Sequence, residues 1–115
     1  MSAASHTIPA ERLRAAVHEL MQGFGSAPRE IELVADNLIQ ANLTGHDSHG
    51  VGMLPRYANA FLEGGLRPNA QVVTKLDAGT LLALDGQAGF GQVIGSQAME
   101  LGIARAQAHG SCIVA

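Results

Sequence analysis

The chain has 115 residues, of which 47% are hydrophobic and 15% charged, so it is long and apolar enough to bury the core of about one small domain. Its net charge of -3 and its pI of about 5.9 argue against nucleic acid or an anionic membrane as a partner. We expect no signal peptide and no membrane-spanning segment, because no apolar run is long enough for either. The single cysteine, Cys112, excludes an internal disulfide framework and favours a reducing, cytoplasmic location.

Three helices are expected in the first part of the chain, after a polar segment at residues 1–7 that is expected to fray. Apolar residues recur at helical spacing in three segments, which are residues 9–23, 26–45 and 48–64. Ser26 and Ser48 are placed to cap the second and third helices, and Gly45 has the position of a glycine that ends a helix. We therefore assign residues 1–65 to a helical subdomain.

After Gly65 the pattern changes to short strands. The expected elements are strands at residues 72–76 and 80–85, a loop at 86–91, a helix that ends at Gly110 and a strand from Cys112. Asp77-Ala78-Gly79 suits the turn of a hairpin between the first two strands. Because the chain ends within an apolar strand, we expect residues 66–115 to be the incomplete beginning of an α/β domain.

The sequence GFGQVIG (Gly89–Gly95) follows a strand and opens a helix, as a dinucleotide-binding fingerprint does. A Rossmann unit also needs an acidic residue about 20 positions later, and none is present there. The preceding strand resembles half of a hairpin and not part of a parallel crossover. We therefore interpret these glycines as a turn and a place of close packing.

The stretch GHDSHG (residues 45–50) is the strongest candidate site. With Ser48 as a helix cap, His49 would start the third helix, where the positive helix end favours neutral imidazole, the form that can accept a proton. Arg56 lies two helical turns later and would return to nearly the same face, roughly 10 Å along the axis, although Pro55 could bend the helix between them. A base and a cation on one face suit a small anionic substrate.

Two other interpretations of this stretch stay open. His49 could be an ordinary solvated residue at a helix start, and Asp47 a simple turn residue. His46, Asp47 and His49 could ligate a metal, but no further ligand cluster supports this, and we predict no metal site. The other histidines, His6, His18 and His109, are interpreted as structural.

Two longer segments carry a family resemblance. LVADNLIQANLTGHDSHGVGMLPRY (Leu33–Tyr57) and LDGQAGFGQVIGSQAMELGIARAQAHG (Leu84–Gly110) resemble, in the same order, two blocks of the malate/L-lactate dehydrogenase family. This is a non-Rossmann group that includes sulfolactate and ureidoglycolate dehydrogenases. The resemblance runs from Pro9 to Ala115 and implies interconversion of a small 2-hydroxy acid and its 2-oxo acid with NAD or NADP as the cofactor.

The resemblance also implies a fold and site residues. The fold would be α+β, with the helical subdomain followed by the start of a mixed-sheet, L-sulfolactate dehydrogenase-like cofactor domain, assembled as a homodimer. His49 would be the general acid/base and, with Ser48, would contact the nicotinamide. Met53 stands where many relatives have arginine, so Arg56 is left as the candidate for the substrate carboxylate. The alternative function is a truncated non-catalytic fragment or pseudoenzyme that retains only a helical association surface.

Overall fold

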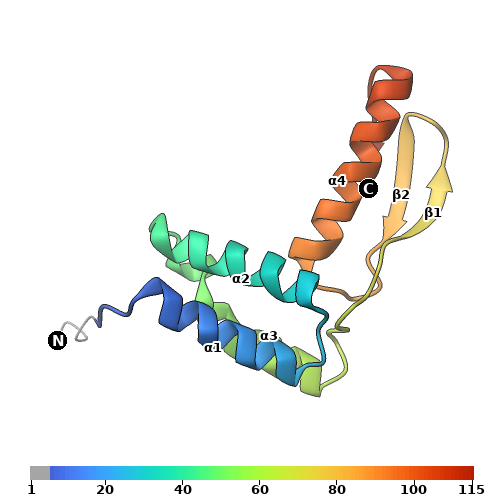
Figure 1. Ribbon diagram of the computed structural model, residues 1–115. Helices are drawn as coiled ribbons and strands as arrows, with labels where there is room; N and C mark the ends of the chain where they lie inside the picture. The colour runs from blue at the N-terminus through green and yellow to red at the C-terminus, as the bar shows by residue number, and fades with distance from the viewer. Residues whose placement is uncertain (1–5) are drawn as a thin grey trace. The chain divides into compact units, whose positions relative to one another are not determined.

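The computed structural model describes residues 6–115, so residues 1–5 of the segment expected to fray lie outside it (Figure 1). The helices are α1 (Ala10–Gly23), α2 (Pro28–Leu43), α3 (Leu54–Leu62) and α4 (Gly91–His109), with short 3-10 helices η1 (Asp47–His49) and η2 (Val51–Met53). The strands are β1 (Val73–Asp77), β2 (Leu81–Asp85) and β3 (Ile113–Val114). No helix in residues 6–115 is both long and apolar enough to cross a membrane.

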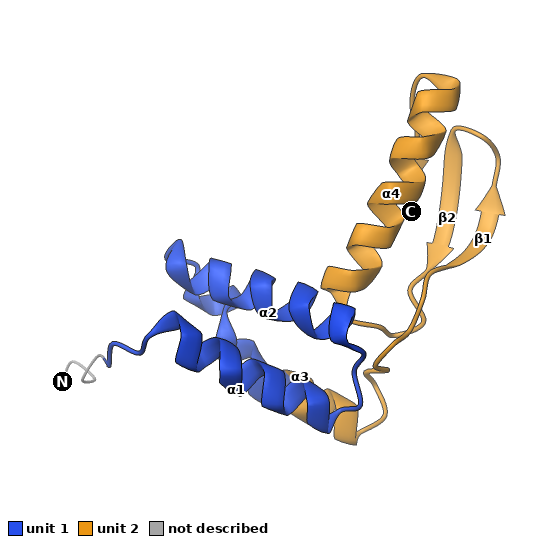
Figure 2. Ribbon diagram, in the orientation of Figure 1, with its two compact units in different colours: residues 1–56 blue, residues 57–115 orange. Residues whose placement is uncertain are grey.

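The chain forms two compact units, one that ends at Arg56 and one that comprises Tyr57–Ala115 (Figure 2). The division falls near the start of α3, within the segment that the sequence pattern treats as one helix. The domain boundary expected between residues 65 and 66 was placed where the sequence pattern changes from helix to strand. That domain boundary stays a prediction.

The core of the first unit lies between α1 and α2. Its buried side chains are Val17, Met21, Ile31, Val34, Ala35, Leu38 and Ile39. These residues lie at the helical spacing expected for residues 9–23 and 26–45, and Ile39 extends the buried stripe of α2 beside Leu38. At the edge of this core Arg14 donates a hydrogen bond to Asp36 over 2.6 Å, and His18 Nε2 lies 3.5 Å from Glu32 Oε1. The interpretation of His18 as structural agrees with this position between the helices.

The start of α2 differs from the expected one. Pro28 is in the first turn, as predicted, but the N-cap residue is Ala27, whose side chain cannot accept a hydrogen bond. Ser26 lies one residue too early to cap the helix and instead donates to Glu30 Oε1 over 2.7 Å in a buried pair. The end of α2 is as predicted, because Gly45 follows it with a left-handed φ of 81°.

The second unit contains a mixed three-stranded sheet in the order β1-β2-β3. β1 and β2 form the predicted antiparallel hairpin, and Gly79 takes a positive φ of 75° in its turn. β3 pairs with β2 in parallel, with Leu82 opposite Val114. The expectation that β2 belongs to a hairpin and not to a parallel crossover is therefore wrong, because β2 belongs to both.

Helix α4 connects β2 to β3 and runs beside the hairpin (Figure 1). A Cβ atom on Gly102 would lie 2.8 Å from Val114 Cγ2, so this buried glycine allows α4 to approach β3 closely. Arg105 of α4 also pairs with Asp77 at the end of β1. The predicted α+β class is confirmed, with helices first and a small mixed sheet after them.

Candidate functional site

The GHDSHG stretch does not begin an α-helix. Residues 47–49 and 51–53 form two 3-10 turns, separated by an extended Gly50 with φ -91° and ψ -153°, and α3 starts only at Leu54. Ser48 is therefore not a helix cap, and His49 is not the first residue of α3. Glycines at positions 50 and 52 weaken helix formation here, and the Val51 N–H donates instead to the side chain of Asn42 over 2.8 Å.

Two features that the sequence predicts for His49 are therefore missing from the structure. Because no α-helix begins at His49, the helix dipole does not act on its imidazole in the expected way. His49 and Arg56 also do not share the face of one continuous helix, so their expected spacing has no basis. Pro55 lies within the first turn of α3, where proline is tolerated, and therefore does not bend a helix between them.

Ser48 and His49 nevertheless interact directly. Ser48 Oγ and His49 Nδ1 are 3.0 Å apart, within hydrogen-bond distance, and both residues are exposed. The imidazole of His46 meets that of His49 edge to face, with ring centroids 5.5 Å apart. The backbone N–H of His49 donates to the carbonyl of His46 over 2.9 Å. The serine contact engages one ring nitrogen of His49 and leaves Nε2 for another partner.

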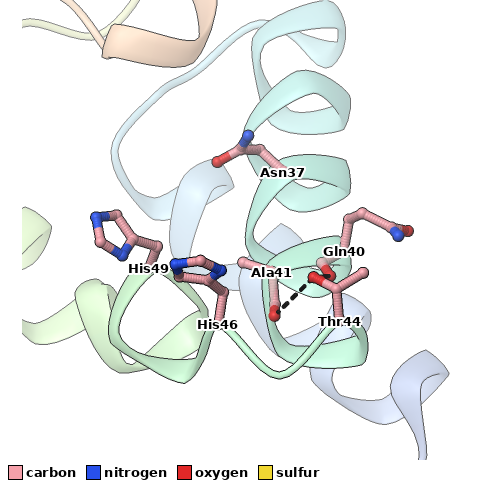
Figure 3. A pocket seen from close by; sticks show the side chains of 6 residues that line it. All are labelled: Asn37, Gln40, Ala41, Thr44, His46 and His49. Atoms are coloured by element: carbon pink, nitrogen blue, oxygen red, sulfur yellow. Dashed lines mark hydrogen bonds between the residues drawn. The ribbon is translucent and has the colours of Figure 1, made fainter.

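The two imidazoles border an open hollow of about 380 Å³ beside α2. Its lining residues are Asn37, Gln40, Ala41, Thr44, His46 and His49. In Figure 3 the rings of His46 and His49 lie next to each other, the Asn37 side chain is on the preceding turn of α2, and Gln40 extends away from the rings. The Thr44 hydroxyl donates back to the carbonyl of Gln40 over 2.9 Å. The hollow therefore offers amide and imidazole groups to a small polar ligand.

Asn42 and Asp47 form a second set of contacts behind the hollow. Asn42 Nδ2 donates to Asp47 Oδ1 over 2.7 Å, and Asn42 Oδ1 accepts from the Val51 N–H. Among residues 6–115 no group of three or more histidine, cysteine, aspartate or glutamate side chains is arranged to hold a metal ion. Asp47 thus does more than form a turn, because it links the 3-10 segment to α2.

Arg56 stands apart from this arrangement. Its side chain is exposed on α3, and none of the six residues that line the hollow is lysine or arginine. Met53, at the position where the resemblance implies arginine in many relatives, ends η2 and is half-buried. A carboxylate-binding cation therefore stays a prediction for Arg56.

The segment GQAGFG contains a tight turn, but its last residue, Gly91, is already the first residue of α4, so the predicted loop at residues 86–91 ends one residue earlier. The Gly89 N–H donates to the carbonyl of Gly86 over 2.9 Å, and Gln87 and Ala88 between them have φ of 54° and 57°, the pattern of a type I′ turn. Gln87 N–H also donates to Asp85 Oδ1 over 2.8 Å, which lowers the pKa of that carboxyl. The N–H groups of Gly89 and Gln87 thus already bond to neighbouring residues of the chain. This supports the interpretation of the glycines as structural.

Sequence reasoning missed Asn37, Gln40 and Asn42. All three lie on α2, where the sequence pattern drew attention only to the apolar stripe. Asn42 carried a weak signal, since a short polar side chain in the last turn of a helix often bonds to nearby backbone. Its partners at residues 47 and 51 depend on how the chain folds back after Gly45, which the spacing of residues does not reveal.

Comparison with known proteins adds to this geometry. Residues 8–115 match the model of the family described as malate/L-lactate dehydrogenase. The chain is 44% identical over 110 residues to hydroxycarboxylate dehydrogenase B of Escherichia coli (strain K12), an alignment that covers 96% of this chain and 30% of the relative. It is 39% identical over 108 residues to malate dehydrogenase of Pyrococcus abyssi, covering 94% and 30%.

A solved structure agrees with these sequence relatives. Malate dehydrogenase from Pyrococcus horikoshii OT3 superposes with a TM-score of 0.85 at 30% identity, over 99% of this chain and 34% of that one. The chain thus spans about 30% of the length of the curated relatives that it matches. Since the family match includes both the GHDSHG loop and the mixed sheet, the chain belongs to the malate/L-lactate dehydrogenase family.

Proposed function

We propose that this chain provides the acid–base part of a site that interconverts a small 2-hydroxy acid and its 2-oxo acid. The observation that carries the proposal is the contact of 3.0 Å between Ser48 Oγ and His49 Nδ1 at the border of a polar hollow. Relatives named for hydroxycarboxylate and malate support this substrate class. The reaction is that of an oxidoreductase.

His49 is the residue that moves the proton. When Nδ1–H donates to Ser48 Oγ, Nε2 carries the lone pair and can accept the proton of the substrate hydroxyl. In the reductive direction the same nitrogen returns that proton. The exposure of the ring leaves Nε2 accessible to a ligand, and the serine contact holds the imidazole in one orientation.

The residues present fit one end of a nicotinamide cofactor. A hollow of about 380 Å³ with amide and imidazole groups suits a nicotinamide ring or a hydroxy acid, but it is too open and small to enclose a dinucleotide. We assign Ser48 and His49 to hold the nicotinamide end. NAD or NADP supplies hydride transfer when it is bound.

Arg56 is proposed to bind the substrate carboxylate. It is exposed and carries a charge that no residue lining the hollow provides. Arg56→Ala should then raise KM for the hydroxy acid more than it lowers kcat, because the ground state and the transition state lose the same ion pair. Arg56→Lys should restore part of the affinity, since lysine keeps the charge but loses the bidentate geometry. An unchanged KM in both variants would remove Arg56 from the site.

The principal test joins residues 8–115 to the part of E. coli hydroxycarboxylate dehydrogenase B that follows its matching segment. Turnover of a panel of 2-hydroxy acids is measured by nicotinamide absorbance. His49→Gln should lower kcat about a hundredfold or more, because general acid–base catalysis contributes that much. His46→Gln is the matched control and should lose far less. A His49→Gln variant with the turnover of the parent fusion would refute the assignment.

A second test uses the 115-residue chain alone. The hollow leaves most of a dinucleotide in solvent, so we expect weak cofactor binding at best and no turnover. Ile113, at the open edge of the sheet, is 68% exposed, which favours self-association. Calorimetric titration with NADH and NADPH, together with light scattering, measures both properties. A monodisperse monomer with micromolar affinity would contradict this expectation.

The family resemblance also leads us to propose a homodimer in the cytoplasm.

A further inference from the structure

Asn42 bonds to both sides of the segment that carries His49. Its Nδ2 donates to Asp47 Oδ1 over 2.7 Å, two residues before His49. Its Oδ1 accepts from the Val51 N–H over 2.8 Å, two residues after His49. One side chain therefore spans residues 47–51 and uses both ends of its amide to do so.

Gly50 packs directly on this amide. A Cβ atom at Gly50 would lie 2.2 Å from Asn42 Oδ1, 2.4 Å from Cγ and 2.5 Å from Nδ2, so only glycine can occupy the position while Asn42 keeps its place. Gly50 is buried, in contrast to its neighbour His49. The backbone thus folds tightly over Asn42 and turns the imidazole outward.

The anchor of this arrangement belongs to a helix that packs in the core. Asn42 is in the last turn of α2, a few residues after Leu38 and Ile39, which are 1% and 4% exposed in the core. By contrast, a 3-10 turn of three residues is weakly stable by itself. The segment at 47–51 therefore takes its position from α2 through the Asn42 side chain.

We propose that Asn42 is a positioning residue for His49, acting through Asp47 and the backbone at Val51. The inference rests on the proposed function, in which His49 transfers the proton. Asn42 is not among the residues that line the hollow. Its effect on the reaction therefore passes through the placement of the imidazole.

An exchange of the two side chains tests this arrangement. Asn42→Asp places a second carboxylate against Asp47 and removes the donor, so the pair repels. The double variant Asn42→Asp/Asp47→Asn restores a donor opposite an acceptor, keeps an oxygen for the Val51 N–H, and has the same net charge as the parent chain. If Asn42 positions His49, the His49 ring should leave its native position in the single variant and return to it in the double variant.

The first readout needs no activity. In the 115-residue chain, the ¹H–¹³C signal of the His49 ring should move in Asn42→Asp and return in the double variant, while the signals of His18 and His109 stay unchanged. The same signal in all three proteins, or a shift that the exchange does not reverse, would overturn the proposal. If Asn42→Asp does not fold, the double variant should fold, and its failure to do so would also overturn the proposal.

The second readout is kinetic and uses the fusion with the E. coli relative. Asn42→Asp should lower kcat about tenfold to a hundredfold, because small displacements of a reacting group have effects of this size. KM should change less, and the double variant should recover most of kcat. An unchanged kcat in Asn42→Asp would overturn positioning while leaving the proposed function intact. If the parent fusion is inactive, the proposed function fails, and the His49 ring signal still decides the role of Asn42.

Discussion

The segments at residues 45–50 and 86–91 both contain glycines near the start of a helix. In the first segment the histidine side chains are exposed to solvent, whereas the second segment packs against the rest of its unit. In the first loop the two imidazoles are exposed beside a hollow, and the buried Gly50 lies against Asn42. In the second loop Gly86 and Gly89 lie against other groups of the protein. A Cβ at Gly86 would lie 2.8 Å from Ile94 Cγ2, and one at Gly89 would lie 2.9 Å from Ala70 Cβ.

Glycine spacing therefore does not distinguish the loop that we propose for ligand binding from a packing turn. In both loops a glycine is required because another group of the protein occupies the space of a side chain. What differs is the direction of the neighbouring side chains, and this direction determines whether a ligand can reach chemically active groups. The following substitutions probe that difference in order of decreasing effect.

Gly50→Ala should have the largest effect. The new methyl group would displace the Asn42 amide and break its hydrogen bonds, at a cost of about 1–3 kcal/mol in the free energy of unfolding. The fusion enzyme should lose most of kcat as His49 moves. In an Asn42→Ala background the methyl group has room, so the further loss in Tm should be small. If the losses in Tm of Gly50→Ala and Asn42→Ala simply added up in the double variant, the contact between the two residues would be contradicted.

Gly89→Ala should lower stability by about 1–3 kcal/mol through overpacking against Ala70 and Ile94. Gly91→Ala is the matched control, because no atom lies within 4 Å of its added Cβ and its φ is not positive. It should be neutral or slightly stabilising. This corrects the expectation from sequence that Gly91 is needed for packing. Denaturant unfolding of both variants measures the difference, and equal destabilisation would refute it.

Ala88→Gly should stabilise the second loop. Ala88 has a φ of 57°, a strained value for a residue with a Cβ, and glycine relieves that strain. The greater flexibility of glycine in the unfolded chain offsets part of the gain, so the net increase in unfolding free energy should be about 0.5–1 kcal/mol. Cofactor affinity in the fusion should not change. A loss of stability would show that the turn has another conformation.

Asp77→Asn should have the smallest effect on stability, and this effect should depend on pH. Hydrogen bonding from Arg105, and then from the Gly79 N–H, lowers the pKa of Asp77 below its ordinary 3.8. A lowered pKa means that the folded state favours the carboxylate, so this stabilisation is present above pH 3.8 and is lost as pH falls through the lower folded value. The Tm difference between parent and variant should therefore shrink in acid. A difference independent of pH would exclude this pair as its source.

Much of the fold follows from local sequence. The apolar stripes of α1 and α2, the hairpin of β1 and β2, and the glycine ends at Gly45 and Gly110 were predicted because they depend on residues close in the chain. The family resemblance likewise identified the GHDSHG loop as the candidate site. Its residue types, two imidazoles with a neighbouring hydroxyl, are a property of the sequence alone.

Tertiary structure decided how those groups are held. The third helix starts at Leu54 and not at Ser48, because the Asn42 side chain takes the Val51 N–H and Gly50 stays extended. The parallel pairing of β2 with β3 is likewise a tertiary feature, and Gly102 lets α4 lie close to Val114 of β3. Such contacts join residues separated by 9 or more positions, and the periodicity of a sequence reports only which neighbours along the chain share a face.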